Sequence, residues 1–284
     1  MIKFSVLIPT YNNLNYLKLA IDSIKHNSIY EHEIILHIND GSDGTLNYAK
    51  NNNLIYTHSS ENIGLCSAIN KASGKVSTEY VLYVHDDMYL CKNWDQILED
   101  EIKSLDNDLF YFSGTNYEAR DIDMRFNPGN SPEQFNPNDF YNFCMTKNEK
   151  DLQGSHWAPH IISKRLWDVV GGFSEEFNPG DGSDPDFCMK LWNNKVRIFK
   201  SIDKFKVFHF GSTTTRKKNV IKNNGTKKFL LKYGFNPKFF RKYYLNGGAD
   251  SIYDGPLNEP QDSLIKSIDL LINKIKFFYY KMSI

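Results

Sequence analysis

Strand-forming and helix-forming patterns alternate along the first 112 residues, and this alternation restricts the chain to few folds. Five runs rich in β-branched and aromatic residues read as short strands: residues 4–8, 33–38, 54–57, 79–84 and 109–112. Four segments that can form helices separate them: residues 14–24, 45–52, 64–72 and 94–105. Parallel neighbours need a connection long enough to cross back to the same edge. The order therefore predicts an α/β fold, with a mainly parallel central sheet flanked by helices.

Two of the predicted strands end in carboxylates. The fourth strand runs into His85-Asp86-Asp87, and the second runs into Asn39-Asp40-Gly41. Open α/β sheets bind ligands outside the carboxyl ends of their strands. We therefore expect Asp40 and Asp87 at one edge of the sheet, where a metal and a phosphorylated ligand would sit. The alternative is that each acid is a plain turn or helix-cap residue.

A later region adds further acids and a histidine. Asp181, Asp184 and Asp186 fall within six residues at the start of a predicted helix. Acids at a helix start are also common as caps or as partners of the helix dipole. A predicted strand at residues 204–210 carries His209 at its end, where imidazole and carboxylates together suit Mn²⁺ or a related ion. Without such acids nearby, a histidine at a strand end is more often a structural residue.

The charge balance and the cysteines exclude several classes of protein. Lys+Arg and Asp+Glu number 34 each, so there is no overall basic field and we expect no nucleic-acid partner. The four cysteines lie far apart and form neither a zinc motif nor a disulfide framework, so we interpret them as reduced packing residues. The first apolar run is too short for a signal peptide, and no run reaches membrane-spanning length. We therefore expect a cytoplasmic protein.

Several short motifs occur together in an order that is specific as a set. They are Ser5–Asn12, Asn39–Thr45, Asn62-x-Gly64, His85-Asp86-Asp87, Gly171-Gly172-Phe173 and Ser183–Asp186. With these motifs the chain resembles the inverting family 2 glycosyltransferases of the GT-A fold across roughly residues 3–215. The resemblance implies a GT-A (nucleotide-diphospho-sugar transferase) domain at residues 1–218 and a helical C-terminal extension at residues 219–284.

The resemblance also implies a donor site at the strand ends. A nucleotide-sugar, expected to be a UDP-sugar, would be bound by Pro9, Thr10, Tyr11, Asn12, Asp40, Asn62 and Asp86. Asp40 is suited to accept the uracil N–H. By the same resemblance Asp87 ligates Mn²⁺ or Mg²⁺, and His209 matches a histidine that completes the metal shell in some relatives. His85 stands where the first Asp of the family's Asp-x-Asp motif is usual, so it puts metal dependence in question.

The resemblance places the catalytic base at Asp184, with Ser183 in place of the usual acidic neighbour. It implies an enzyme of the hexosyl- or N-acetylhexosaminyl-transferase type. The acceptor is expected to be a glycan, glycolipid or glycoprotein. Trp157, Asp181 and Asp186 are the candidate residues for binding it.

Two segments carry no motif. Residues 117–150 are polar and rich in Asn and Pro, and we expect them to form a long loop that acts as a lid or binds the acceptor. Residues 220–284 are lysine-rich, and we expect helices that pack on the catalytic domain. The alternative for the last helix, which carries Lys266, Lys274, Lys276 and Lys281, is peripheral contact with a membrane surface.

Three competing functions remain at this level. A Rossmann dinucleotide enzyme would need a Gly-x-Gly-x-x-Gly turn after the first strand, where this chain has Pro9-Thr10-Tyr11-Asn12. A sugar nucleotidyltransferase would ordinarily show a Gly-rich triphosphate-binding loop at the same place. A degenerate GT-A domain that binds glycans or acts as a scaffold is motivated by the replaced acids at His85 and Ser183.

Overall fold

The computed structural model describes residues 2–147, 149–154, 157–211, 223–247 and 251–282. Its strands are β1 (Ser5–Tyr11), β2 (Glu33–Asn39), β3 (Ile55–Ser59), β4 (Tyr80–Tyr83), β5 (Met88–Leu90), β6 (Phe110–Tyr117), β7 (Leu152–Gln153), β8 (His160–Ser163) and β9 (Ile198–His209). They form one sheet in the order β3-β2-β1-β4-β8-β6-β9-β5, and β7 pairs with β9. The four neighbouring strands β3, β2, β1 and β4 are parallel to one another, as predicted. The sheet as a whole is mixed, because β8 runs antiparallel to β4 and β6, and β5 runs antiparallel to β9.

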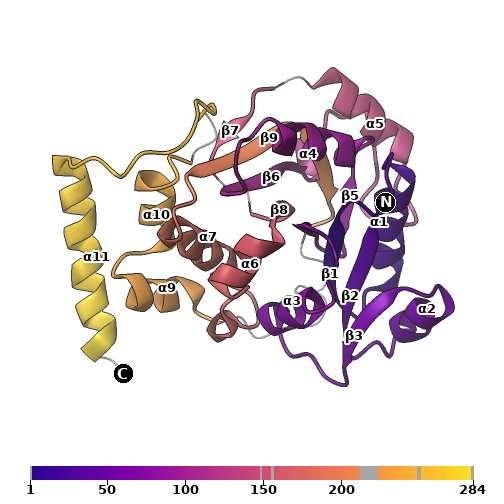
Figure 1. The fold of residues 1–284 in the computed structure, drawn as a ribbon, viewed down its shortest axis with the longest axis horizontal. Coiled ribbons are helices and arrows are strands. Elements are labelled where there is room, and N and C mark those ends of the chain that lie inside the picture. Colours follow the sequence, from indigo (N-terminus) through magenta and orange to yellow (C-terminus); the bar gives the residue numbers. More distant parts are fainter. Residues whose placement is uncertain (1, 148, 155–156, 212–222, 248–250, 283–284) are drawn as a thin grey trace.

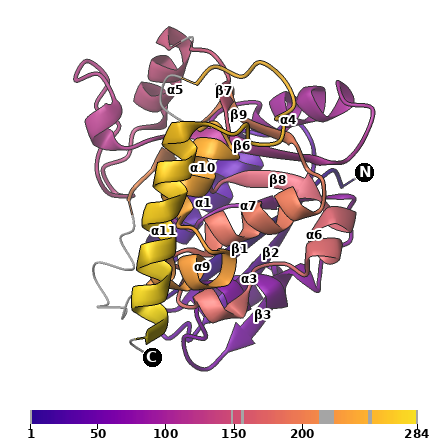
Figure 2. The same ribbon diagram turned by 90° about the vertical axis from the view of Figure 1, so that its left-hand side faces the viewer.

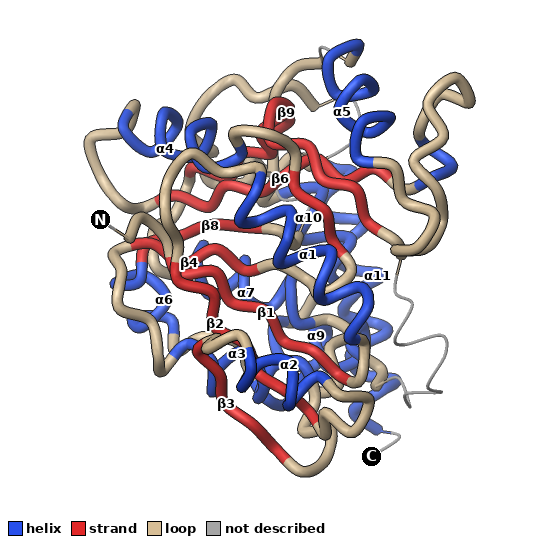
Figure 3. Tube along the Cα trace, turned by 90° about the vertical axis from the view of Figure 1, so that its right-hand side faces the viewer, coloured by secondary structure: helices blue, strands red, loops and turns tan. Residues whose placement is uncertain are grey.

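The helices of the described residues lie on both faces of this sheet and at the outer edge of the molecule (Figures 1 and 2). They are α1 (Leu14–His26), α2 (Thr45–Asn51), α3 (Leu65–Ser73), α4 (Trp94–Lys103), α5 (Pro137–Thr146), α6 (Lys164–Val170), α7 (Ser183–Asn193), α9 (Gly225–Tyr233), α10 (Pro237–Tyr243) and α11 (Leu264–Met282), with short 3₁₀ turns at Ala119–Asp121 and Glu175–Phe177. Helix α1 lies on one face, and α3, α6 and α7 lie on the other (Figures 1 and 3). The residues of β2 are all buried, which explains their nearly continuous apolar run.

Strand β1 is longer than its sequence pattern predicts. We expected Pro9 to end it, but β1 continues to Tyr11 in register with β2. Val84, just after β4, donates its backbone N–H to the Leu7 carbonyl (3.0 Å). The backbone polar groups of Leu7 therefore point toward β4, and the backbone of Pro9, two residues later, points the same way. Strand β4 has ended at that level, and the missing N–H of Pro9 therefore removes no hydrogen bond from the ladder.

The segment at residues 117–150 was wrongly predicted to be a long loop. It contains α5, whose Phe140 and Phe143 are buried in the core. Asn136-Pro137 indicated a turn, but the Asn136 side chain accepts a hydrogen bond from the Asn138 N–H (3.1 Å) and caps the helix. Proline is favoured at the first position of a helix, where its missing N–H would have no partner. The same two residues therefore serve as a helix start.

The C-terminal part continues the core of the first 211 residues. Phe229, Phe240, Leu245 and Leu257 are buried in one hydrophobic cluster with the strands of the sheet. The predicted boundary at residue 218 lies outside the described residues. Helix α11 stands at the outer edge of the molecule, beyond α9 and α10 (Figures 1 and 2). The three cysteines Cys66, Cys91 and Cys188 are buried, Cys144 is partly buried, and all four are free thiols, as predicted.

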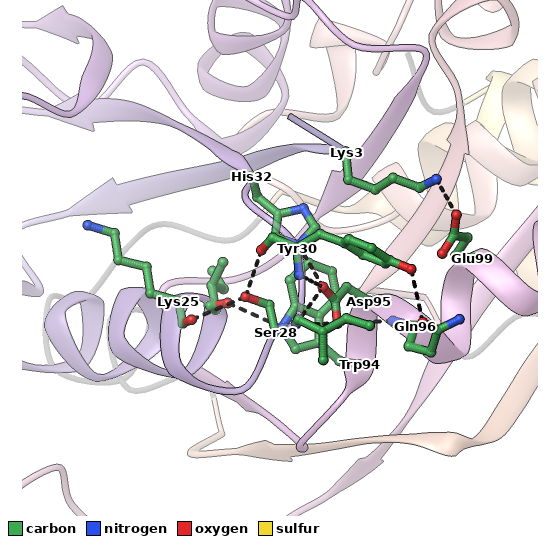
Figure 4. A network of polar contacts seen from close by, with 11 residues as sticks. Lys3, Lys25, Ser28, Tyr30, His32, Trp94, Asp95, Gln96 and Glu99 are labelled. Atoms are coloured by element: carbon green, nitrogen blue, oxygen red, sulfur yellow. Dashed lines mark hydrogen bonds and ion pairs between the residues drawn. The ribbon is translucent and has the colours of Figure 1, made fainter. Parts of the chain in front are cut away.

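A buried carboxylate joins α4 to the turn before β2. Asp95 accepts hydrogen bonds from the backbone N–H groups of Ile29 (2.9 Å) and Tyr30 (2.8 Å), and its Oδ2 lies 3.1 Å from His32 Nε2 (Figure 4). Burial works to raise the pKa of Asp95, but the hydrogen bonds outweigh it and the pKa is lowered. The ionised carboxylate is therefore the form that the fold stabilises.

We expect Asp95→Ala to lower the free energy of unfolding by about 3 kcal/mol, because it leaves two N–H groups without their charged acceptor. Urea denaturation at pH 7 measures this. Asp100→Ala is the matched control, since Asp100 is exposed on the same helix, and it should change stability by less than about 0.5 kcal/mol. Equal losses in the two variants would contradict the role given to Asp95.

Candidate functional site

The short strand β5 brings Asp87 and His209 together. After β4 the chain passes through His85-Asp86-Asp87 and turns into β5, which runs antiparallel to β9 with Met88 opposite His209. The Phe210 N–H donates to the Asp87 carbonyl (3.0 Å) and closes this pairing. The Asp87 Oδ1 atom lies 3.2 Å from His209 Nε2. Two residues more than 120 positions apart are thus placed side by side by strand register.

His85 joins these two residues in a cluster that fits a divalent metal. One ligand atom from each of His85, Asp87 and His209 lies within 4.8 Å of the others. Burial lowers the pKa of His85 to about 4, so its imidazole is neutral at pH 7 and has a nitrogen lone pair to offer. For His209, burial works to lower the pKa, but the Asp87 carboxylate outweighs it and the pKa is raised. Two imidazoles and a carboxylate suit Mn²⁺ or another transition ion better than Mg²⁺, which prefers oxygen ligands.

Asp86, the other acid of His85-Asp86-Asp87, contacts the end of β1. Thr10 and Asp86 are both buried, and the Thr10 hydroxyl donates to Asp86 Oδ2 at 2.6 Å. Pro9 is buried in the same strand, while Tyr11 at its end is partly exposed. The carboxyl ends of β1 and β4 are therefore linked by a hydrogen bond between two of the predicted nucleotide-binding residues.

Asp40 lies just after β2 and is fixed by its neighbours. The side-chain NH₂ group of Asn12 donates to Asp40 Oδ2 (2.7 Å), and the side-chain oxygen of Asn12 accepts from the Gly41 N–H (2.8 Å). Asn12 and Asp40 have φ angles of 46° and 62°, which non-glycine residues adopt uncommonly. Such conformations persist where the surroundings impose them and are frequent at ligand sites. The predicted residues Asn12 and Asp40 thus meet where the neighbouring strands β1 and β2 end.

Asn62 has a local structural contact in this structure. It is exposed, and its side-chain oxygen accepts a hydrogen bond from the Gly64 N–H (3.0 Å) where α3 begins. This contact gives Asn62 a turn-forming role. Its predicted part in nucleotide binding stays a prediction.

Asp184 lies in the first turn of α7 with one oxygen of its carboxylate buried. Among the described residues, no hydrogen-bond partner reaches its buried Oδ1 atom. Burial raises the pKa of Asp184 to about 7. A carboxylate with this pKa takes up a proton readily near neutral pH, which is the property of a general base. Ser183, which by the resemblance stands in the place of an acid, is buried and its hydroxyl donates to the Gly180 carbonyl (2.7 Å).

Tyr83 at the end of β4 was missed by the sequence reasoning. It is fully buried, and its hydroxyl has no hydrogen-bond partner within the described part of the chain. Burial, and then the charge of Asp184, raise the pKa of Tyr83 well above its usual value. The protonated hydroxyl is thus a donor within electrostatic range of Asp184. In sequence Tyr83 is one of several aromatic strand residues, and nothing in the pattern separates it from the core.

The three candidate acceptor residues differ in their surroundings. Asp186 is fully buried and engaged by Lys232 Nζ (2.7 Å) and the Tyr233 hydroxyl (2.7 Å), which ties α7 to α9. Asp181 is exposed, and its Oδ2 accepts from the Gly225 N–H (2.9 Å). Trp157 is partly exposed with a φ of 65°, and its carbonyl accepts from the Tyr111 hydroxyl (3.1 Å). Their part in acceptor binding stays a prediction.

Comparisons with known proteins give a consistent result. The family model described as "Glycosyl transferase family 2" matches residues 5–160. Chondroitin synthase of Pasteurella multocida (strain Pm70) is 27% identical over 267 residues, which cover 87% of this chain and 26% of that protein. Hyaluronan synthase of Pasteurella multocida is 27% identical over 229 residues, which cover 78% of this chain and 22% of that protein. The chain thus spans about a quarter of the length of these curated relatives.

Solved structures show the same fold. The crystal structure of S. aureus TarS matches 98% of this chain and 44% of TarS, with a TM-score of 0.53 and 14% sequence identity. The structure of TarS residues 1–349 matches 71% of this chain and 60% of that chain, with a TM-score of 0.51 and 19% identity. At these identities the likeness concerns the arrangement of helices and strands.

Proposed function

The chain belongs to glycosyl transferase family 2 and is a glycosyltransferase with the GT-A fold, and from this premise we propose that it transfers a sugar from a UDP-sugar to an acceptor hydroxyl with inversion. The observation that carries this proposal is the carboxylate of Asp184, whose Oδ1 is buried without a partner among the described residues and whose pKa is raised to about 7. Its charge acts on Tyr83, the last residue of β4, after which the chain leads into Asp87. The site thus offers a proton acceptor close to a cluster suited to a metal.

The donor would lie across the carboxyl ends of β1, β2 and β4. Asp40 accepts the uracil N–H, with Thr10, Tyr11 and Asn12 around the base and ribose and Asp86 near the ribose or phosphates. The fixed contacts of Asn12 with Asp40, and of Thr10 with Asp86, support this placement because they hold the binding groups in position before the donor arrives.

The metal would be held by Asp87 and His209, with His85 as a third ligand. A bound divalent cation supplies positive charge next to the departing diphosphate. We propose Mn²⁺, because the imidazole nitrogens of the cluster favour a transition ion over Mg²⁺. The pairing of β5 with β9 sets the spacing between Asp87 and His209.

Asp184 would take the proton from the acceptor hydroxyl. As the proton moves to its carboxylate, the acceptor oxygen forms a bond to the anomeric carbon from the face opposite UDP. The bond between that carbon and the phosphate oxygen breaks, and its electron pair leaves with UDP. A single displacement of this kind inverts the anomeric configuration. Holding both partners in line supplies much of the rate enhancement.

A glycan is the acceptor class that we propose. Two relatives are named for the synthesis of chondroitin and of hyaluronan, which supports a sugar hydroxyl as the nucleophile. Trp157 and Asp181 are accessible for contact with it, whereas Asp186 would act through the position of α9.

A thermal-shift screen of nucleotide-sugars, with and without Mn²⁺, tests the donor. Ligands that bind the folded state stabilise it, by about 2.7 kcal/mol at a concentration of 100 times Kd. We expect a UDP-sugar with Mn²⁺ to raise Tm more than GDP-sugars, ADP-sugars or UTP do. UDP release with a panel of glycans then tests transfer. Stabilisation by UTP with product formed only from a sugar phosphate would indicate nucleotidyl transfer, and donor binding without turnover on any acceptor would indicate a binding protein.

A further inference from the structure

Helix α11 turns an apolar face to solvent. Apolar or aromatic side chains that are between 45% and 82% exposed occupy nearly its whole length: Leu264, Ile265, Ile268, Leu271, Ile272, Ile275, Phe278, Tyr279 and Met282. At 3.6 residues per turn these positions fall on one arc of about 140°. Monomeric proteins rarely leave so continuous an apolar surface uncovered, and such surfaces mark sites of contact with a partner or a membrane.

The opposite face of α11 fixes the helix on the protein. Asn273 is 4% exposed and its side-chain oxygen accepts from the Asn236 N–H at 2.9 Å. Asp269 accepts from Lys242 Nζ (2.8 Å) and from the Tyr243 hydroxyl (2.6 Å). These contacts set the rotation of α11 on α9 and α10 and turn its apolar arc away from the sheet. Figure 2 shows the helix in front of the molecule, with α9 and α10 behind it.

Lysines border the apolar arc on both sides. By the same helical geometry, Lys276 lies next to one border, and Lys274 and Lys281 lie next to the other. The acidic residue of α11 is Asp269, which is already paired with Lys242. An apolar strip with lysines at both borders matches a membrane surface that contains anionic lipids, since the apolar side chains enter the acyl boundary while lysines meet the headgroups.

We propose that α11 binds the surface of a membrane rich in anionic lipids, with its apolar arc inserted. Within the described residues, no helix combines the length and the apolar character needed to cross a bilayer, so the contact is with the surface. The proposal goes beyond the sugar-transfer reaction and uses none of the residues assigned to it. The expected packing of α11 on the domain is compatible with it, since Leu270 and Asn273, which pack on the domain, lie on the side opposite the apolar arc.

A second copy of this chain fits α11 less well. Leu264, Ile268, Leu271, Ile275 and Phe278 follow the alternating spacing of four and three residues that coiled coils use. However, 19 residues make fewer than three heptads, and pairing of two identical helices through this arc would bring the lysines that flank it near those of the partner. The charge pattern therefore favours a negatively charged surface over a second identical helix.

Co-sedimentation of the full chain with sucrose-loaded vesicles tests this proposal. We expect at least tenfold more protein on vesicles of phosphatidylcholine with 30% phosphatidylglycerol, roughly a biological content of anionic lipid, than on pure phosphatidylcholine. Ile268→Asp with Ile275→Asp should reduce binding at least about tenfold, because both side chains leave the acyl boundary. Lys274→Gln, Lys276→Gln and Lys281→Gln together should reduce it roughly a hundredfold, since each lysine near an anionic surface is worth about a factor of five.

Val169→Asp is the matched control, because Val169 is 56% exposed on α6, away from α11. It should bind vesicles as the unchanged chain does. Unaltered Tm and UDP-sugar binding in the α11 variants show that the fold is intact. Equal binding to neutral and anionic vesicles, no loss in the variants, or a dimer in sedimentation velocity that the isoleucine variant abolishes would each overturn the proposal.

Discussion

Asp184→Asn is expected to lower kcat about a thousandfold while leaving the affinity for the UDP-sugar within about twofold. Asparagine has nearly the same shape but accepts no proton, so the acceptor hydroxyl must attack without general-base assistance. The buried Oδ1 has no hydrogen-bond partner among the described residues, so the substitution breaks no bond recorded for it there. Steady-state UDP release and calorimetric titration of the donor measure the two effects separately. Near-normal turnover would remove Asp184 from the base role.

The dependence of kcat/KM on pH tests the role of Asp184 independently. The base acts in its ionised form, so kcat/KM should rise with pH through about 7, where the pKa of Asp184 is placed by burial, and level off above it. This ascending limb should be absent in Asp184→Asn. The matched control is Glu175→Gln, since Glu175 is an exposed carboxylate in the turn that precedes α7. This variant should keep both the kcat of the unchanged chain and the rise of kcat/KM with pH.

Stability should respond to pH in the opposite sense. The folded protein holds a proton on Asp184 that the unfolded chain releases, so this residue's contribution to stability falls as pH rises from about 4 to about 7. Asp184→Asn avoids ionising a carboxyl in a buried place and should have a higher Tm than the unchanged chain at pH 8. A variant that is slower but more stable is typical of a site where function opposes stability.

The parallel part of the fold could be predicted from local pattern because each of its elements carries its own signal. Strands β1 to β4 and helices α1 to α3 were expected close to where they occur, since periodicity and turn residues define them. Strands β5, β7 and β8 are only two to four residues long and were not predicted. They exist through pairing with β9 or β4, which are distant in sequence, so no local signal specifies them.

The same distinction applies to the site. The contact of Asn12 with Asp40 follows from two parallel neighbours that end at one edge of the sheet, the edge at which Asp40 and Asp87 were expected. The approach of His85 to His209 depends on the antiparallel return of β5, which the sequence pattern does not reveal. From the sequence, His85 is therefore interpreted as the replacement of a metal-binding acid. In the structure it lies with Asp87 and His209 as a third group that suits a metal.

Asp87→Ala is expected to abolish Mn²⁺-dependent binding of UDP, with a loss of affinity of at least about a hundredfold. Residues that only orient metal ligands already contribute 10- to 100-fold in affinity, by the usual order of magnitude. Calorimetric titration with Mn²⁺ and UDP measures this without requiring an acceptor. Asp106→Ala, which removes an exposed carboxylate far from the strand ends, should leave the titration unchanged. Unaltered binding in Asp87→Ala would exclude this residue as the ligand.

His85→Asp extends the same argument to the identity of the ion. It replaces an imidazole nitrogen with carboxylate oxygens, which Mg²⁺ prefers, so the ratio of Mn²⁺ affinity to Mg²⁺ affinity should fall about tenfold or more. Competition between the two ions, followed by electron paramagnetic resonance of free Mn²⁺, gives the ratio directly. His26→Asp is the matched control, since His26 is exposed at the end of α1. If the ratio stays constant in His85→Asp, the imidazole of His85 lies outside the coordination shell, and the ion is held by Asp87 and His209 alone among these three residues.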